Sequence, residues 1–199
     1  MSLGDAVSYP ELDFEENTFS FIAGKSGCGK STYLRMLNRT VLPTEGHIIY
    51  DGSEAGTYPV LEYRRSVLLV PQEVFLFDGS IRDNFHRYAD VRGTEPASDE
   101  EMRSLMKVCC ADFDLGTDCR NLSVGERQRV FLSVFLSFMP RVLMLDEPTA
   151  ALDEKTAFNV LSNIKAFCRE NGITVICVCH SETLIDGFAD TAVRLEASE

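Results

Sequence analysis

The chain has 199 residues, of which 19 are Lys or Arg and 31 are Asp or Glu, so its formal net charge is −12. This length favours a single domain, and a hydrophobic share of 45% is enough to bury an ordinary core. Affinity for nucleic-acid backbones comes mainly from clustered cationic side chains, so the acidic balance argues against direct nucleic-acid binding.

Targeting and redox features point to a reducing compartment. The longest uncharged apolar stretch, Val130 to Pro140, is shorter than the roughly 20 residues that span a bilayer. Asp5 stands where a secretory signal would carry basic residues, so we expect a cytoplasmic protein without an export signal. The cysteines form no C-x-x-C pair and are expected to be reduced core thiols: Cys28, Cys109, Cys110, Cys119, Cys168, Cys177 and Cys179.

Short β-branched and aromatic runs alternate with helical patterns, which is typical of parallel strands joined by crossover helices. The expected core strands are Phe19–Ala23, His47–Tyr50, Ser66–Val70, Val142–Leu145, Ile173–Val178 and Ala192–Leu195. The segment from about Phe75 to Asn121 predicts short helices inserted into this α/β core, and the spacing of apolar residues between Asp153 and Glu170 predicts an amphipathic helix.

A glycine-rich loop follows the first core strand and opens a helix that runs to about Thr40. Its sequence, GKSGCGKS, fits the phosphate-binding pattern G-x-x-x-x-G-K-[ST], and an ordinary glycine-rich turn would rarely have both flanking elements. Lys30 is expected to reach the terminal phosphates of ATP, and the Ser31 hydroxyl to bind Mg²⁺. The predicted MgATP-binding residues are Gly24, Lys25, Ser26, Gly27, Cys28, Gly29, Lys30, Ser31 and Thr32.

Two carboxylates, Asp146 and Glu147, end the apolar run Val142–Leu145. Ligands of α/β sheets sit at the carboxyl ends of the strands. Many strands that end in two acidic residues only lead into a polar loop. A phosphate-binding loop in the same chain favours a functional role for these two carboxylates. We therefore expect Asp146 to hold Mg²⁺ and Glu147 to polarise the attacking water.

A third segment, Leu122–Arg129, taken by itself is only a helix start with Ser123 as its N-cap. In the order phosphate loop, Gln72, this segment, Asp146-Glu147 and His180, nearly the whole chain resembles the ATP-binding cassette (ABC) ATPases. The resemblance implies one domain over 1–199: a P-loop NTPase-type, mostly parallel α/β core at about 1–72 and 123–199, with a small antiparallel β part and a helical subdomain at about 73–122.

The resemblance also implies roles for single residues. Ser123 and Gly125 belong to the signature, which meets the γ-phosphate bound by a second cassette. The common signature is LSGGQ, and this sequence departs from it at Val124 and Glu126. These departures put the efficiency of the signature in doubt more than its identity. Gln72 is expected to serve catalysis and bind the metal, and His180 is expected to be the switch histidine.

The adenine site and the docking surface leave alternatives open. Family members stack the base on an aromatic residue before the phosphate loop, and Tyr9 is the first candidate, against Phe14 or none. Phe75, Leu76 and Phe77 either fill a local core or form a docking surface for a membrane partner.

The family resemblance also implies partners. The first hypothesis is the ATPase subunit of an ABC transporter, a homodimer or cassette heterodimer that is peripheral to the membrane through a separate permease. The alternative is a soluble cassette protein in DNA repair, translation or iron–sulfur assembly. Brevity and the stretch from Phe138 to Glu154 are similar to the ATP-binding subunits of iron-export transporters.

Overall fold

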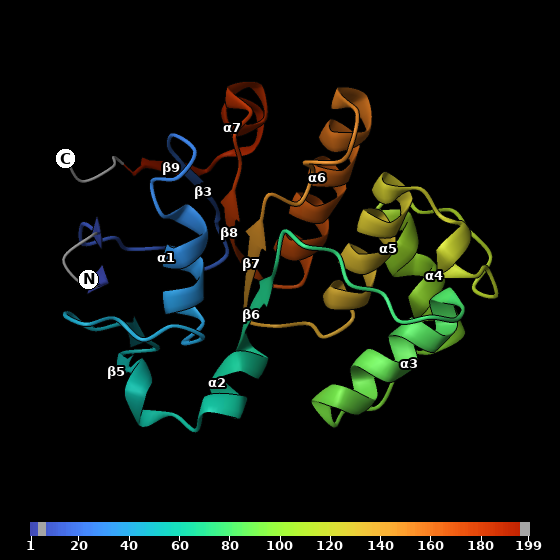
Figure 1. Cartoon of the computed structure of the whole chain (residues 1–199), viewed down its shortest axis with the longest axis horizontal. Coiled ribbons are helices and arrows are strands. Elements are labelled where there is room, and N and C mark those ends of the chain that lie inside the picture. The colour runs from blue at the N-terminus through green and yellow to red at the C-terminus, as the bar shows by residue number, and fades with distance from the viewer. Residues whose placement is uncertain (4–6, 196–199) are drawn as a thin grey trace. The chain divides into compact units, whose positions relative to one another are not determined.

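The computed structural model describes residues 1–3 and 7–195 (Figure 1). The chain forms two compact units. We call Met1–Val70, Pro140–Glu147 and Gly172–Glu199 the sheet unit, and Pro71–Met139 with Pro148–Asn171 the helical unit. None of the helices in the described ranges is long and apolar enough to cross a bilayer.

A five-stranded sheet in the order β6-β7-β8-β3-β9 is the centre of the sheet unit. All four of its strand pairs are parallel. Strands β3 and β8 are buried along their whole length, which explains why they read as continuous apolar runs. The strands are β3 (Phe19–Ala23), β6 (Val67–Val70), β7 (Val142–Asp146), β8 (Thr174–Val178) and β9 (Thr191–Arg194).

The antiparallel part of the sheet unit is small. It consists of two pairs of two-residue strands, β1 (Ser2–Leu3) with β2 (Val7–Ser8) and β4 (Ile49–Tyr50) with β5 (Ser53–Glu54). The mostly parallel α/β core with a small antiparallel part, which the sequence predicts, is confirmed.

The prediction that His47–Tyr50 is a core strand is wrong. Only Ile49 and Tyr50 are in a strand, and it pairs with β5 outside the main sheet. Asp51 and Gly52 have φ values of 50° and 72°, a combination that closes a tight hairpin. The turn therefore commits this segment to a local partner, and it leaves Ile49 60% exposed.

The helices of the sheet unit are α1 (Lys30–Leu37), α2 (Val60–Ser66) and α7 (Glu182–Phe188), with a 3-10 turn at Ala55–Thr57. Helix α1 packs Tyr33 and Leu34 into a core cluster that also contains Ile22, Met144 and Ile176 of the sheet. The helix that begins at the glycine-rich loop is thus fixed against the strands that carry the acidic residues.

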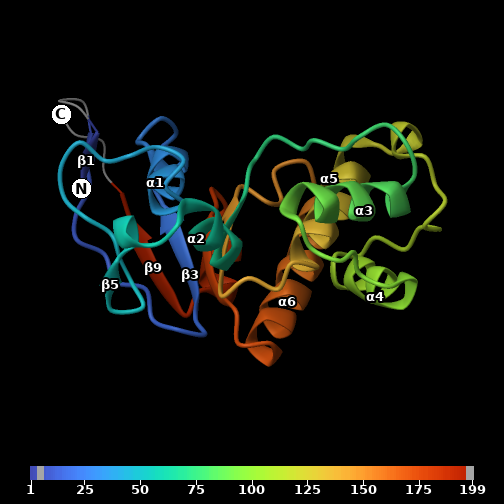
Figure 2. The same cartoon turned by 90° about the horizontal axis from the view of Figure 1, so that it is seen from below.

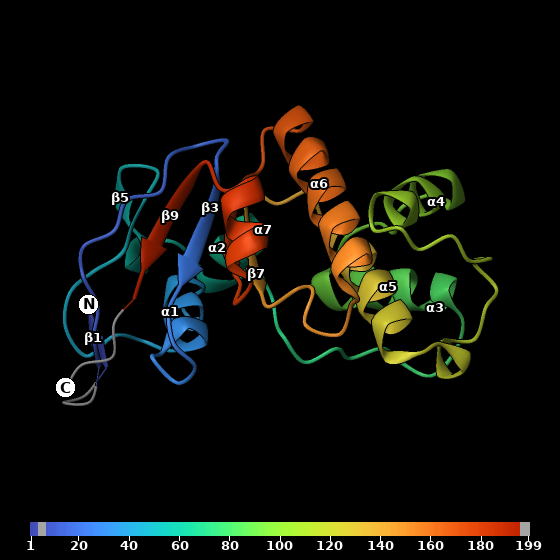
Figure 3. The same cartoon turned by 90° about the horizontal axis from the view of Figure 1, so that it is seen from above.

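The helical unit contains α3 (Ile81–Arg92), α4 (Asp99–Val108), α5 (Val124–Leu136) and α6 (Glu154–Glu170), with a 3-10 turn at Cys119–Asn121 (Figure 2). Helix α5 packs against α3 and α4, and α4 packs against α6. Figure 3 shows α6, the longest helix of this unit. The contacts place α5 and α6 in the helical unit, whereas the sequence assigns both helices to the α/β core. The expected boundaries of the helical subdomain, at about 72 and 123, therefore stay a prediction.

Capping boxes fix where three of these helices begin. Ser80, Ser98 and Ser123 each accept a hydrogen bond from the backbone N–H three residues on, and the acidic residue at that position binds back to the cap. The seven cysteines are free thiols, six of them buried, and burial raises the pKa of Cys168 to about 12. The cysteine pattern therefore builds cores, as the sequence predicts.

Candidate nucleotide site

The glycine-rich loop joins β3 to α1 at the carboxyl end of the sheet. Gly24, Gly27 and Gly29 all have positive φ, and two of them also lack room for a side chain. A Cβ on Gly24 would lie 2.5 Å from the Leu195 carbonyl oxygen, and a Cβ on Gly29 would lie 2.5 Å from the Tyr9 hydroxyl. These close approaches explain why the loop needs glycine at both positions.

Lys30 lies folded into this loop. Its Nζ donates to the carbonyl oxygens of Gly24 at 2.8 Å and Lys25 at 2.9 Å, and the residue is only 5% exposed. The loop thus surrounds a buried cation at the N-terminus of α1, where the helix dipole adds positive potential. A polyphosphate fits this arrangement in charge and in hydrogen-bonding capacity.

Ser31 and Asp146 form an oxygen-rich pair beside the loop. The Ser31 hydroxyl donates to Asp146 Oδ1 at 2.9 Å. Burial raises the pKa of Asp146, and the hydrogen bond from Ser31 offsets part of that rise. A hydroxyl and a carboxylate in contact are ligands that Mg²⁺ prefers, so these two residues fit the expected metal site.

Because Asp146 has a raised pKa in the folded state, its contribution to stability is complete below pH 3.8 and is lost as pH rises through the folded pKa. Asp146→Asn should therefore raise the melting temperature of the nucleotide-free protein at pH 7, by about 2–4 °C if the gain is near 1 kcal/mol. Calorimetric melts from pH 3 to 7 would check this, and a gain that persists undiminished below pH 3.8 would contradict the cause given.

Glu147 and His180 meet at the ends of neighbouring strands. His180 Nε2 lies 2.8 Å from Glu147 Oε1. The Glu147 N–H donates to the Val178 carbonyl at 3.1 Å, and its φ of 50° is one that non-glycine residues adopt at a cost. The backbone therefore turns sharply after β7 and holds a partly exposed carboxylate against the imidazole.

Tyr9 does not lie where a base could stack on it. The residue is 4% exposed, its hydroxyl donates to the Gly29 carbonyl at 3.0 Å, and its ring packs on Tyr33 with centroids 5.0 Å apart. We therefore withdraw Tyr9 as the adenine-stacking residue, because its faces are covered by protein. Its hydroxyl holds Gly29 of the phosphate loop instead. The alternative, Phe14, is half-buried.

The remaining expected site residues, Gln72, Ser123 and Gly125, belong to the helical unit. Gln72 is exposed, just after β6, and its catalytic and metal roles stay predictions. The Ser123 hydroxyl donates to Glu126 Oε2 at 2.7 Å, and this contact lowers the pKa of Glu126. The signature segment thus carries an anionic carboxylate in contact with the serine that is expected to meet a phosphate.

Sequence reasoning missed a residue that links the signature to the loop after Asp146-Glu147. The Ala151 N–H donates to Gln128 Oε1 at 3.2 Å, and Gln128 is only 4% exposed. A buried amide on the apolar side of a helix is the signal that could have found it.

Gly125 lies against the same loop, since a Cβ on it would be 2.9 Å from the Ala151 carbonyl oxygen. Gly→Ala in a helix normally gains up to about 1 kcal/mol. Here the backbone contact should reverse the sign, so Gly125→Ala is expected to lower the free energy of unfolding by about 1 kcal/mol in urea titrations. Gly56→Ala, which meets no atom within 4 Å, should have little effect; equal results for the two variants would contradict this.

Comparisons with known proteins identify the family of the chain. A family model described as "ABC transporter" matches residues 8–150. The probable iron export ATP-binding protein FetA of Escherichia coli (strain K12) is 34% identical over 97% of this chain and 86% of its own length. ABC transporter I family member 17 of Arabidopsis thaliana is 37% identical over 90% of this chain and 68% of that protein.

Solved structures show the same fold. The dimeric MJ0796, described as a bacterial ABC transporter cassette, matches with a TM-score of 0.84 at 26% identity, over 97% of this chain and 89% of that chain. The same cassette in a post-hydrolysis state bound to ADP and Pi has a TM-score of 0.83, at 26% identity over 98% of this chain and 90% of that chain. The chain belongs to the ABC transporter family and is an ATP-binding ABC ATPase.

Proposed function

We propose that this chain is the nucleotide-binding subunit that powers a separate transmembrane permease, by closing on a second cassette around MgATP and opening after hydrolysis. The observation that carries the proposal is the Glu147–His180 contact beside the Ser31–Asp146 pair, at the carboxyl edge of one sheet. This arrangement supports Glu147 as the general base and Ser31 with Asp146 as the metal-binding pair beside the phosphate loop.

In this proposal the chain's own residues position the phosphates of ATP and polarise the attacking water. Lys30 leaves its two loop carbonyls and binds the β- and γ-phosphates. Ser31 and Asp146, with Gln72, would hold Mg²⁺, which when bound neutralises charge on the phosphates. Glu147 accepts a hydrogen bond from the attacking water and takes its proton, and His180 holds that carboxylate in place.

The second cassette supplies the signature. Ser123 and Gly125 begin α5, whose N-terminus attracts a phosphate. With one phosphate loop and one signature in the chain, a homodimer or a cassette heterodimer completes two sites. The permease would place the protein on the cytoplasmic face of the membrane. FetA is named as a probable iron export protein, and the similarity to it supports a metal ion as the permease's cargo.

The helical unit offers an exposed aromatic surface for the permease. Phe75 is 57% exposed and meets half-buried Phe77 edge to face at 5.0 Å between centroids. The prediction that Leu76 shares this surface is wrong, because Leu76 is 6% exposed and fills the local core. An exposed aromatic pair of this kind favours association with another protein.

Phe75→Asp should abolish recovery of the permease when the tagged protein is isolated from its native membrane fraction, because a charge replaces the apolar contact. Leu61→Asp changes an apolar residue of the sheet unit that is 69% exposed, and it should leave recovery intact. Mass spectrometry of the recovered membrane proteins measures the difference. If both variants recover the permease equally, the docking surface lies elsewhere.

A further inference from the structure

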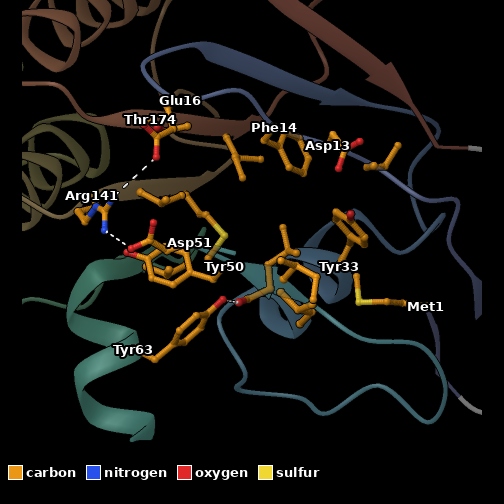
Figure 4. Close-up of a pocket in the computed structure, with 18 of the residues that line it drawn as sticks. Met1, Asp13, Phe14, Glu16, Tyr33, Tyr50, Asp51, Tyr63, Arg141 and Thr174 are labelled. Carbon is orange, nitrogen blue, oxygen red and sulfur yellow. Dashed lines mark hydrogen bonds and ion pairs between the residues drawn. The ribbon is translucent and has the colours of Figure 1, made fainter. Parts of the chain in front are cut away.

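A cavity of about 670 Å³ lies within the sheet unit, apart from the phosphate loop. Its walls include Val67, Val142 and Thr174, which stand at the amino ends of β6, β7 and β8. Thr174 is labelled in Figure 4. The phosphate loop and Asp146-Glu147 lie at the opposite, carboxyl ends of the strands. Among the described lining residues, only Phe14, the alternative candidate for stacking adenine, belongs to the predicted nucleotide site, and none belongs to the phosphate loop or to Asp146-Glu147.

Part of the cavity wall is apolar and aromatic, as in sites that bind small organic molecules, and the rest is polar. Leu12, Phe14, Ile48, Tyr50 and Val142 line it and are only partly buried, so each keeps surface that a ligand could cover. Beneath them Tyr33, Met144 and Ile176 belong to the buried core. The volume falls in the range of small-molecule sites, roughly 300–1,000 Å³.

The charges around the cavity favour a cation. Among the described lining residues, two cations, Arg141 and the N-terminal ammonium of Met1, stand against four carboxylates: Glu11, Asp13, Glu16 and Asp51. Arg141 already pairs with Asp51 at 2.9 Å and Glu16 at 3.6 Å, so little of its charge remains for an anionic ligand. Glu11 and Asp13 make no ion pair within the described ranges and are exposed.

Arg141 also shows how this wall holds a cation. Its guanidinium carbon lies 5.7 Å from the centre of the Tyr50 ring while its nitrogens meet the two carboxylates. A cation between an aromatic face and carboxylates is a favourable arrangement, because both attract positive charge. The same combination of groups, Phe14 next to Asp13, is present on another wall (Figure 4).

We propose that this cavity binds a flat aromatic organic cation, with its rings against Phe14, Tyr50 and Ile48 and its charge toward Glu11 and Asp13. The proposal goes beyond the ATPase function and does not depend on it.

Two dyes of similar size and opposite charge test the class of ligand. The cationic dye thioflavin T should bind saturably, one per chain, with a dissociation constant of tens of micromolar or below in fluorescence titrations. The anionic dye anilinonaphthalene sulfonate should bind at least tenfold more weakly. Absence of saturable thioflavin T binding, or equal affinity for the two dyes, would overturn the proposal.

Charge reversal locates the binding. The double variant Glu11→Lys/Asp13→Lys should weaken thioflavin T binding about tenfold. Asp90→Lys/Asp112→Lys changes the net charge equally at exposed positions of the helical unit and should weaken it less than twofold. All four substitutions are at exposed sites, and unchanged melting temperatures would verify folding. If the two double variants bind the dye alike, the dye occupies another surface and the proposal fails. ATP affinity, measured in parallel, reports on the nucleotide site separately.

Discussion

Glu147→Gln is expected to lower ATP turnover at least a hundredfold while leaving ATP affinity within about threefold of the wild type. General bases contribute roughly 10²–10⁴ to rate, and an amide cannot take the proton of the attacking water. The substitution nearly preserves side-chain shape, and the phosphate contacts that we propose are made by Lys30 and Ser31, not by Glu147. The loss should therefore appear in kcat and not in binding.

Phosphate release under single-turnover conditions would measure the loss, with calorimetry for ATP affinity. The matched control is Glu170→Gln, which makes the same chemical change at an exposed site on α6. His180→Ala should reduce turnover as well, because the carboxylate loses the imidazole 2.8 Å away. A Glu147→Gln protein with more than a tenth of wild-type turnover would exclude Glu147 as the base.

Lys30→Ala is expected to weaken ATP binding by roughly 10- to 150-fold, which corresponds to the 1.5–3 kcal/mol of a hydrogen bond to a charged group. Lys30 is the buried cation inside the loop, and its removal also leaves the Gly24 and Lys25 carbonyls without their donor. Calorimetric titration with ATP measures the effect. Lys155→Ala, an exposed lysine on α6, serves as control, and unchanged ATP affinity in Lys30→Ala would refute the assigned role.

Sequence reasoning reached the features that depend on local pattern. The β3 strand and the glycine-rich loop after it, and the apolar run that ends in Asp146-Glu147, are read from consecutive residues, and strands buried on both faces leave continuous apolar runs. His180 was found by its order in the chain, and the structure places it against Glu147 because β7 and β8 are neighbours.

Other features depend on contacts that no local pattern encodes. Tyr9 packs its ring on Tyr33 and bonds its hydroxyl to Gly29, and these two partners are 20 or more residues away in sequence. Gln128 accepts a hydrogen bond from Ala151, which is 23 residues away in sequence. A hairpin turn pairs Ile49 and Tyr50 with β5, outside the main sheet. In each case a long-range partner or the geometry of a turn determines the position of the residue, and residue type alone does not predict it.

Light scattering of Glu147→Gln with and without MgATP tests the proposed ATP-driven closure most directly. With intact ATP the sample should have the mass of two 22.2 kDa chains, and without nucleotide the mass of one. Adding Ser123→Arg should keep the protein monomeric in MgATP, because an arginine at the start of α5 blocks the signature by bulk. A Glu147→Gln protein that binds ATP yet stays monomeric at tens of micromolar would contradict closure on a second copy of this chain.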